Sequence, residues 1–457
     1  MSKLPFTTRR VFLKAALATA GTCLLPRCSE PAAGAADASR FDAGLDAGAP
    51  AGPDAGADGG AAGADASASA GPDASTDAGT PFTGARPGYM KGQPVRTWLQ
   101  IPNSKLSQVD PRYSALNPNA PNDDPYGWGF ASLVGAWSGA AFDRSTGLWL
   151  SAGEGHQDGS GNEVVAVNLT AAAPTAVLRK PPSTQISALA GGKYGDDSPV
   201  ARHTYWNLVA YAGELWMFGG ASYPNGNAIK DVWRLDASAN WVREYLDPYP
   251  GGLWGDHNAW GFCAPRWEKD GSLREVLWSP GTSDAPCRAW DLQTKTWGPT
   301  LFRWNPGAYS AARWHAQRGV LVILGGNTLL IWDGVSGHAP VEAKVADAYL
   351  PPQYVLGAHG FVHDPKRDVY YLWNGGSDHG SLVTLTPPAV GEELTGTWTF
   401  GKLVNTGTPP SFAAAEDGRP DNAAYGGTFG RLELIPEYDA VFLYSRVEDD
   451  LSFLLLS

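Results

Sequence analysis

The chain has 457 residues, with 46 acidic against 34 basic side chains and a formal net charge of −12. Residues 1–28 carry +5 and residues 29–85 carry −8, which leaves −9 for residues 86–457. This acidic balance argues against nucleic acid or an anionic membrane surface as the main partner.

The amino terminus has the pattern of an export signal. Arg9 and Arg10 stand in the run TRRVFLK, and the apolar stretch 15–25 behind them is too short to span a bilayer. We therefore expect residues 1–28 to be a twin-arginine signal peptide. Cys23 and Cys28 end it where a lipid-modified cysteine would stand, although the residues before both depart from the usual lipoprotein pattern. A lipid anchor and plain secretion are alternatives, which place the protein in the periplasm, on the outer membrane or outside the cell.

Residues 29–90 are rich in Ala, Gly and Asp and poor in large apolar residues. Such a composition buries too little surface to offset chain entropy, so we predict a disordered linker. The folded domain is then expected over residues 91–457.

A strand–turn–strand phrase recurs six times in that domain. Units of this length cannot bury a core alone, which predicts an all-β fold, a six-bladed β-propeller with four-stranded blades. The second strands are expected at 147–155, 214–220, 274–281, 320–326, 369–376 and 439–446. The third strands are expected at 163–169, 231–236, 288–292, 328–333, 381–386 and 452–457. Seven blades are the alternative, if residues 129–142 or 181–199 contain further strands.

The sixth unit reaches the end of the sequence without an outer strand. Residues 96–101, RTWLQI, have the character of an outer strand and no partner of their own. We expect them to fill the gap and join the two ends of the domain, because an open sheet edge is a liability.

The unit with Gly219 and Gly220 resembles the kelch repeat, and the chain from about residue 94 resembles the kelch and galactose-oxidase propeller superfamily. The units at Gly281 and Arg446 lack the double glycine of that pattern. The resemblance implies a fold, while propellers host many activities.

In such blades the first strand begins at the end of the propeller where the second strand turns into the third. We call this end the mouth, and most histidines of the chain are predicted there. The expected catalytic residues are His156, Arg202, His203, Tyr205 and His257. The expected substrate-binding residues are Asp158, Arg288, His359, Asp378, His379 and Arg446. Of the other histidines, His315 and His363 fall further along first strands and His338 lies in an outer loop.

These residue types suit β-elimination from an acidic polysaccharide. That reaction needs a cation for the developing enolate, a base for the proton and an acid for the leaving oxygen. Arg202 would neutralise the carboxylate, His156 or His203 would be the base and Tyr205 the acid. The runs GEGHQDGSGNEV, from Gly153, and RHTY, from Arg202, also resemble propeller polysaccharide lyases of the ulvan-lyase kind, with Glu154 where Gly is expected.

A non-catalytic glycan- or protein-binding propeller is the alternative function, with Trp206, Trp254, Trp260 and Tyr223 as stacking residues near the mouth. No cofactor is expected, with a divalent metal in the mouth as the alternative. The sequence does not predict the oligomeric state. Cys263 and Cys287 fall on the first and third strands of one blade, so a disulfide between them requires a bulge or an end-on approach.

Overall fold

The structure is a computed structural model. It describes residues 84–111, 129–135, 137–155, 159–186, 191–223, 226–247, 261–281, 284–304, 310–325, 328–346, 359–373, 380–411 and 427–457. In these ranges nearly all regular structure is β. The short helical elements are α2 (Ser132–Gly135), η1 (Gly88–Met90), η2 (Leu106–Val109), η3 (Gly129–Ala131) and η6 (Phe429–Arg431). No helix in the described ranges has the length and apolar character that a membrane crossing requires.

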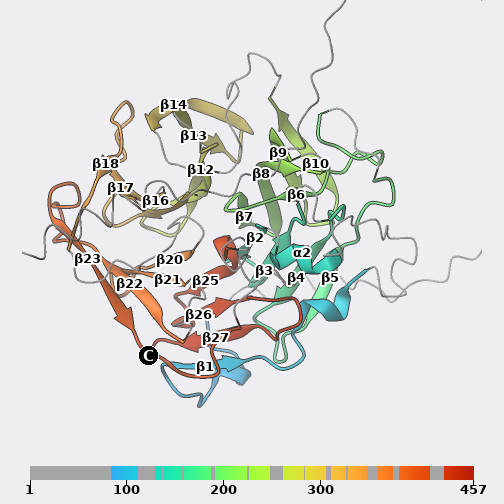
Figure 1. Cartoon of the computed structure of the whole chain (residues 1–457), viewed down its shortest axis with the longest axis horizontal. Helices are drawn as coiled ribbons and strands as arrows, with labels where there is room; N and C mark the ends of the chain where they lie inside the picture. The colour runs from blue at the N-terminus through green and yellow to red at the C-terminus, as the bar shows by residue number, and fades with distance from the viewer. Residues whose placement is uncertain are drawn as a thin grey trace, which may run out of the picture. The chain divides into compact units, whose positions relative to one another are not determined.

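Six small antiparallel sheets are arranged around a common axis as a six-bladed β-propeller (Figure 1). Blade 1 contains β2 (Gly139–Asp143), β3 (Leu148–Ala152), β4 (Val164–Asn168) and β5 (Ala176–Lys180). Blade 2 contains β6 (Arg202–His203), β7 (Leu208–Tyr211), β8 (Glu214–Ser222), β9 (Asn227–Leu235) and β10 (Trp241–Leu246). Blade 3 contains β11 (Phe262–Trp267), β12 (Leu273–Ser279), β13 (Ala285–Asp291) and β14 (Thr296–Trp304).

The remaining blades follow the same order from the axis outward. Blade 4 contains β15 (Ala311–His315), β16 (Val320–Gly325), β17 (Thr328–Trp332) and β18 (Val341–Glu342). Blade 5 contains β20 (Gly360–Asp364), β21 (Val369–Trp373), β22 (Leu382–Thr386) and β23 (Thr397–Leu403), with β19 (Lys344–Ala346) on its outer edge. Blade 6 contains β25 (Leu432–Ile435), β26 (Ala440–Leu443), β27 (Ser452–Leu455) and β1 (Thr97–Gln100), with β24 (Thr406–Gly407) on its outer edge.

The predicted six-bladed architecture is confirmed. In the described residues each expected second and third strand overlaps an observed one, although β8, β9 and β13 extend beyond the expected bounds. The segments that could have held a seventh blade do not form one in their described parts. Residues 139–143 are the first strand of blade 1, and residues 191–199 contain only an isolated bridge between Lys193 and Pro199.

The two ends of the domain join in blade 6, as predicted. Strand β1 pairs antiparallel with β27, with Trp98 opposite Leu454 and Gln100 opposite Ser452. Strand β24 then covers the free edge of β1 in parallel pairing. The blade therefore combines strands from both ends of the propeller sequence, which removes its open edge.

The hydrophobic core lies between neighbouring blades. Successive side chains of a strand point to opposite faces of its sheet, so each strand contributes to two layers. On β21, Tyr370 and Leu372 join the layer shared with blade 4. Tyr371 and Trp373 join the layer shared with blade 6. These two layers are therefore apolar on both faces of β21.

Candidate functional site

His203 and Tyr205 form a hydrogen-bonded pair at the mouth. His203 Nδ1 lies 3.2 Å from Tyr205 Oη, and the two rings meet edge to face with centroids 5.6 Å apart. His203 is 1% exposed and Tyr205 is 3% exposed. A phenol and an imidazole in direct contact can exchange a proton, so this pair is a candidate for acid–base chemistry.

The backbone around the pair is strained and tightly packed. Tyr205 has a φ of 46°, a region that a bulky residue rarely adopts. Its backbone N–H donates to the carbonyl oxygen of Trp137 at 2.7 Å. A Cβ atom at Gly155 would lie 1.8 Å from His203 Cδ2, so only glycine fits beside the imidazole. Strain of this kind persists where the surroundings fix the conformation, and it gathers at functional sites.

Thr204 fastens the pair to blade 1. Its hydroxyl donates to the Ala152 carbonyl and accepts the Gly139 N–H, both at 2.9 Å. The mouth loop of blade 1 is held by Glu154, the residue that stands where the lyase pattern has Gly. The buried Glu154 carboxylate accepts the Gly161 N–H at 2.7 Å. This hydrogen bond links the segment after β3 to the segment before β4.

Arg202 has a structural position that differs from its predicted role. Its guanidinium is 1% exposed and lies 2.5 Å from Asp231 Oδ1 on β9. The other Asp231 oxygen accepts the Trp233 indole N–H at 2.6 Å. The guanidinium also donates to three backbone carbonyls, those of Gly192, Val200 and Gly219. Because the buried guanidinium spends its donors on Asp231 and these carbonyls, we leave Arg202 out of the candidate catalytic residues.

The other predicted site residues divide into three groups. His359, directly before β20, and Arg446, between β26 and β27, lie at the mouth as expected. Arg288 does not, because β13 begins at Ala285 and places Arg288 inside the strand, where it donates to the Gly298 carbonyl at 3.1 Å. The residues outside the described ranges are His156, Asp158, His257, Asp378 and His379.

A cavity of about 220 Å³ on the propeller axis was not anticipated from the sequence. Innermost strands of all six blades contribute to its wall, including Glu433 of β25, Arg313 of β15 and Trp206 of blade 2. Arg313 lies over the Trp206 ring, 4.6 Å from its centroid. Burial raises the pKa of Glu433 to about 7, although the guanidiniums of Arg313 and Arg144 oppose that shift. Each blade contributes only residues in or near its innermost strand to this wall, and these strands are far apart in the sequence. No local sequence pattern therefore predicts the cavity.

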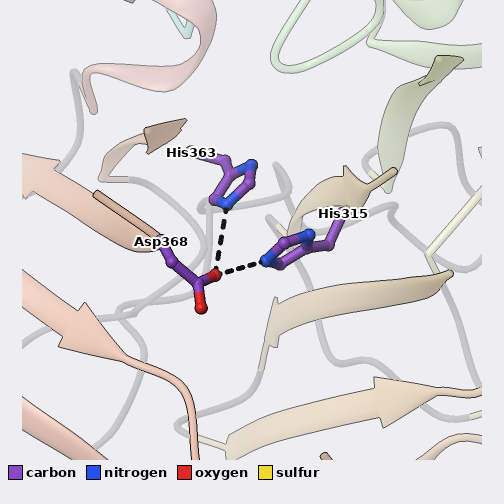
Figure 2. A group of neighbouring side chains, drawn as sticks. All are labelled: His315, His363 and Asp368. Atoms are coloured by element: carbon purple, nitrogen blue, oxygen red, sulfur yellow. Dashed lines mark hydrogen bonds and ion pairs between the residues drawn. The ribbon is translucent and has the colours of Figure 1, made fainter. Parts of the chain in front are cut away.

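A second polar cluster lies at the opposite end of the propeller, where first strands turn into second strands. We call this end the turn face. His315, His363 and Asp368 converge there, one ligand-type atom of each lying within 4.8 Å of the others (Figure 2). The sequence placed both histidines along first strands and away from the mouth, which is correct. No motif in the sequence links these residues, because they meet only where blade 4 packs against blade 5.

The two cysteines of blade 3 do not form a disulfide. Cys263 on β11 and Cys287 on β13 are both free and fully buried, with strand β12 between them. Burial raises the pKa of both thiols well above the usual range. They are therefore apolar core residues in blade 3.

Comparison with known proteins assigns the chain to no family. No protein-family model matches the chain, and no curated protein matches it either. The similarity to kelch repeats and to propeller lyases thus remains a prediction from short motifs, whereas the β-propeller fold is a property of the structure.

Proposed function

We propose that this protein is an exported, carbohydrate-active β-propeller that cleaves an acidic polysaccharide by β-elimination at the mouth. The observation that carries the proposal is the hydrogen bond between His203 Nδ1 and Tyr205 Oη. The reaction needs a base and then an acid, and Tyr205 can act as both if its own proton passes to His203 and back. The twin-arginine motif at Arg9 and Arg10 supports export.

The pair can move protons in a closed cycle. Tyr205 Oη takes the proton next to the uronate carboxyl group while its own proton passes to His203 Nδ1. The carbon–oxygen bond to the leaving sugar breaks as the carbon–carbon double bond forms, and Tyr205 Oη delivers its proton to the leaving oxygen. His203 then returns a proton to Tyr205, so both side chains regain their starting state.

The substrate carboxylate also needs a cation, because negative charge develops there in the transition state. Arg202 is committed to Asp231 inside blade 2. Arg446 lies at the mouth beyond β26 and is only half-buried. We assign it the neutralising role that Arg202 was expected to have.

Binding without cleavage is the second candidate function, and the burial of the pair favours it. Tyr205 is 3% exposed and His203 is 1% exposed, which leaves little surface for direct contact with a sugar. Aromatic stacking by Trp206 is not part of this alternative, because its ring is 2% exposed and contacts Arg313. The binding surface would then come from the loops around the mouth.

A single panel of acidic polysaccharides separates the two candidates. Cleavage is followed by the ultraviolet absorbance of the unsaturated uronate product, and binding by retardation of the full chain in gels that contain the same polymers. Tyr205→Phe tests the mouth, and Tyr211→Phe at the turn face is the matched control. Product from wild type and the control but not from Tyr205→Phe supports the lyase. Retardation without product from any form supports the binding protein, and neither signal on any polymer contradicts both.

A further inference from the structure

We propose that His315, His363 and Asp368 form a binding site for a divalent transition-metal ion of the zinc class at the turn face. The site is independent of the proposed lyase function, because it lies at the other end of the propeller from His203 and Tyr205. It would fasten blade 4 to blade 5 where their innermost strands end.

Two neighbouring blades place the three side chains together. His315 is the last residue of β15, and His363 is the residue before the end of β20. Asp368 directly precedes β21 in the turn after β20, with a φ of 52°. The two imidazole rings lie 4.0 Å apart between centroids, and the carboxylate points toward both (Figure 2).

The distances are close to those of a metal site. Asp368 Oδ1 lies 2.7 Å from His315 Nε2 and 4.0 Å from His363 Nε2. Ligand atoms of a tetrahedral zinc ion, with bonds of about 2.0–2.1 Å, stand about 3.3 Å apart. Relative to Asp368 Oδ1, an ion therefore requires His315 Nε2 to retreat and His363 Nε2 to approach by well under 1 Å each, with the His315 proton carried on Nδ1.

Both imidazoles are buried and have unused nitrogen atoms. His315 is 2% exposed, and the His363 side chain is 9% exposed. Within the described residues, His315 Nδ1 and His363 Nε2 have no hydrogen-bond partner. Buried polar atoms almost always have a partner, so an imidazole nitrogen left over beside a carboxylate calls for one. A metal ion would satisfy His363 Nε2 directly.

The charges of the surrounding groups permit a divalent ion. A metal ion binds the neutral form of both imidazoles, and the Asp368 carboxylate would bring one negative charge to it. Arg318 is shared between Asp368 and Glu393, with its Nη1 2.7 Å from Glu393 Oε1 and its Nη2 2.5 Å from Asp368 Oδ2. Two carboxylates thus face the Arg318 guanidinium, and the Arg144 guanidinium also acts electrostatically on His363.

The ligand types select the ion. Two imidazoles and one carboxylate suit zinc and its neighbours, whereas calcium and magnesium prefer oxygen ligands alone. Arg318 would orient the Asp368 carboxylate from outside the ligand set. Access is open, because the Asp368 side chain is 42% exposed and His363 lines the axial cavity. Three protein ligands leave a fourth position for water or a small ligand.

The test is a zinc titration of the full chain, without a polyhistidine tag and after removal of metal by a chelator. Wild type is compared with His315→Gln and His363→Gln, and His338→Gln is the matched control, since that side chain is 61% exposed. We expect one zinc ion to bind wild type and the control at a site that both cluster variants weaken at least tenfold. Zinc should also raise the melting temperature of wild type but not of the cluster variants.

A cobalt titration of wild type keeps the proposal testable if the variants fail to fold. Cobalt bound by two imidazoles and a carboxylate should give visible absorption bands that one equivalent of zinc abolishes. Equal zinc binding by wild type and His363→Gln, or a wild type without such bands, would overturn the site. Calcium stabilisation equal to that by zinc would overturn the assignment of the metal class.

Discussion

Trp98 on β1 lies opposite Leu454 on β27, so strands from the two ends of the propeller sequence share one antiparallel ladder. The Trp98 ring is 1% exposed in the layer between blades 5 and 6. Its indole N–H donates to the Gly380 carbonyl of blade 5 at 3.0 Å. One side chain thus closes the ring of blades both by strand pairing and by contact with the neighbouring blade.

Trp98→Ala should therefore destabilise the whole propeller. Removal of a buried Trp leaves a cavity and an unpaired carbonyl, and the expected loss is about 3–5 kcal/mol in the free energy of unfolding. Denaturant unfolding followed by tryptophan fluorescence measures this loss. Val95→Ala, at a neighbouring residue that is 47% exposed, should change stability by less than about 0.5 kcal/mol. Equal stability of the two variants would mean that β1 does not close the ring.

The ion pair of Arg202 and Asp231 should be structural. Asp231→Asn leaves a buried guanidinium without its counter-charge, and the expected loss of stability is about 3–5 kcal/mol. The matched control is Asp284→Asn, because the pair of Asp284 with Arg303 is exposed and should contribute below about 1 kcal/mol. Thermal and denaturant unfolding give both values. Normal stability of Asp231→Asn would return Arg202 to the candidate catalytic residues.

Glu433 should make the propeller less stable as the pH rises. Its pKa is about 7 in the folded protein, above the ordinary value of 4.5, so the folded state holds a proton that the unfolded state releases. Stability contributed by this group is full below about pH 4.5 and is lost as the pH rises through 7. Glu433→Gln should thus be more stable than wild type at pH 8, by on the order of 1 kcal/mol, and similar at pH 4.5.

The exposed Glu437 provides the control for this pH effect. Glu437→Gln should follow the wild-type profile of stability against pH at every point. If Glu433→Gln also follows it, then the carboxyl group is not held neutral by burial in the axial cavity.

The fold could be predicted because its signals are local and repeated. A run such as residues 214–220 has the alternation and the glycine turn of paired strands, and six such runs suffice to place the blades. The closing strand at Trp98 could be predicted too. The sequence contains one strand without a partner near residue 98 and one repeat unit that lacks its outer strand.

The site could be predicted only in part, because side-chain partners depend on tertiary contacts. The sequence shows His203 and Tyr205 two residues apart, but β6 ends at His203 and Tyr205 lies in a turn with a φ of 46°, so their contact depends on that turn. The sequence shows neither Asp231, which binds Arg202 across blade 2, nor the start of β13, which moves Arg288 away from the mouth. His315 and Asp368 are 53 residues apart in the sequence, and only the packing of blade 4 on blade 5 brings them together.

The rate at which Tyr205→Phe cleaves an acidic polysaccharide tests the central claim most directly. The variant removes one oxygen atom and keeps the ring in its packing against Phe429. We predict that wild type releases unsaturated uronate and that the variant does so about 100-fold more slowly or worse, with unchanged retardation in a polysaccharide gel. A variant as fast as wild type, or a wild type that forms no product from any acidic polymer, would contradict the account.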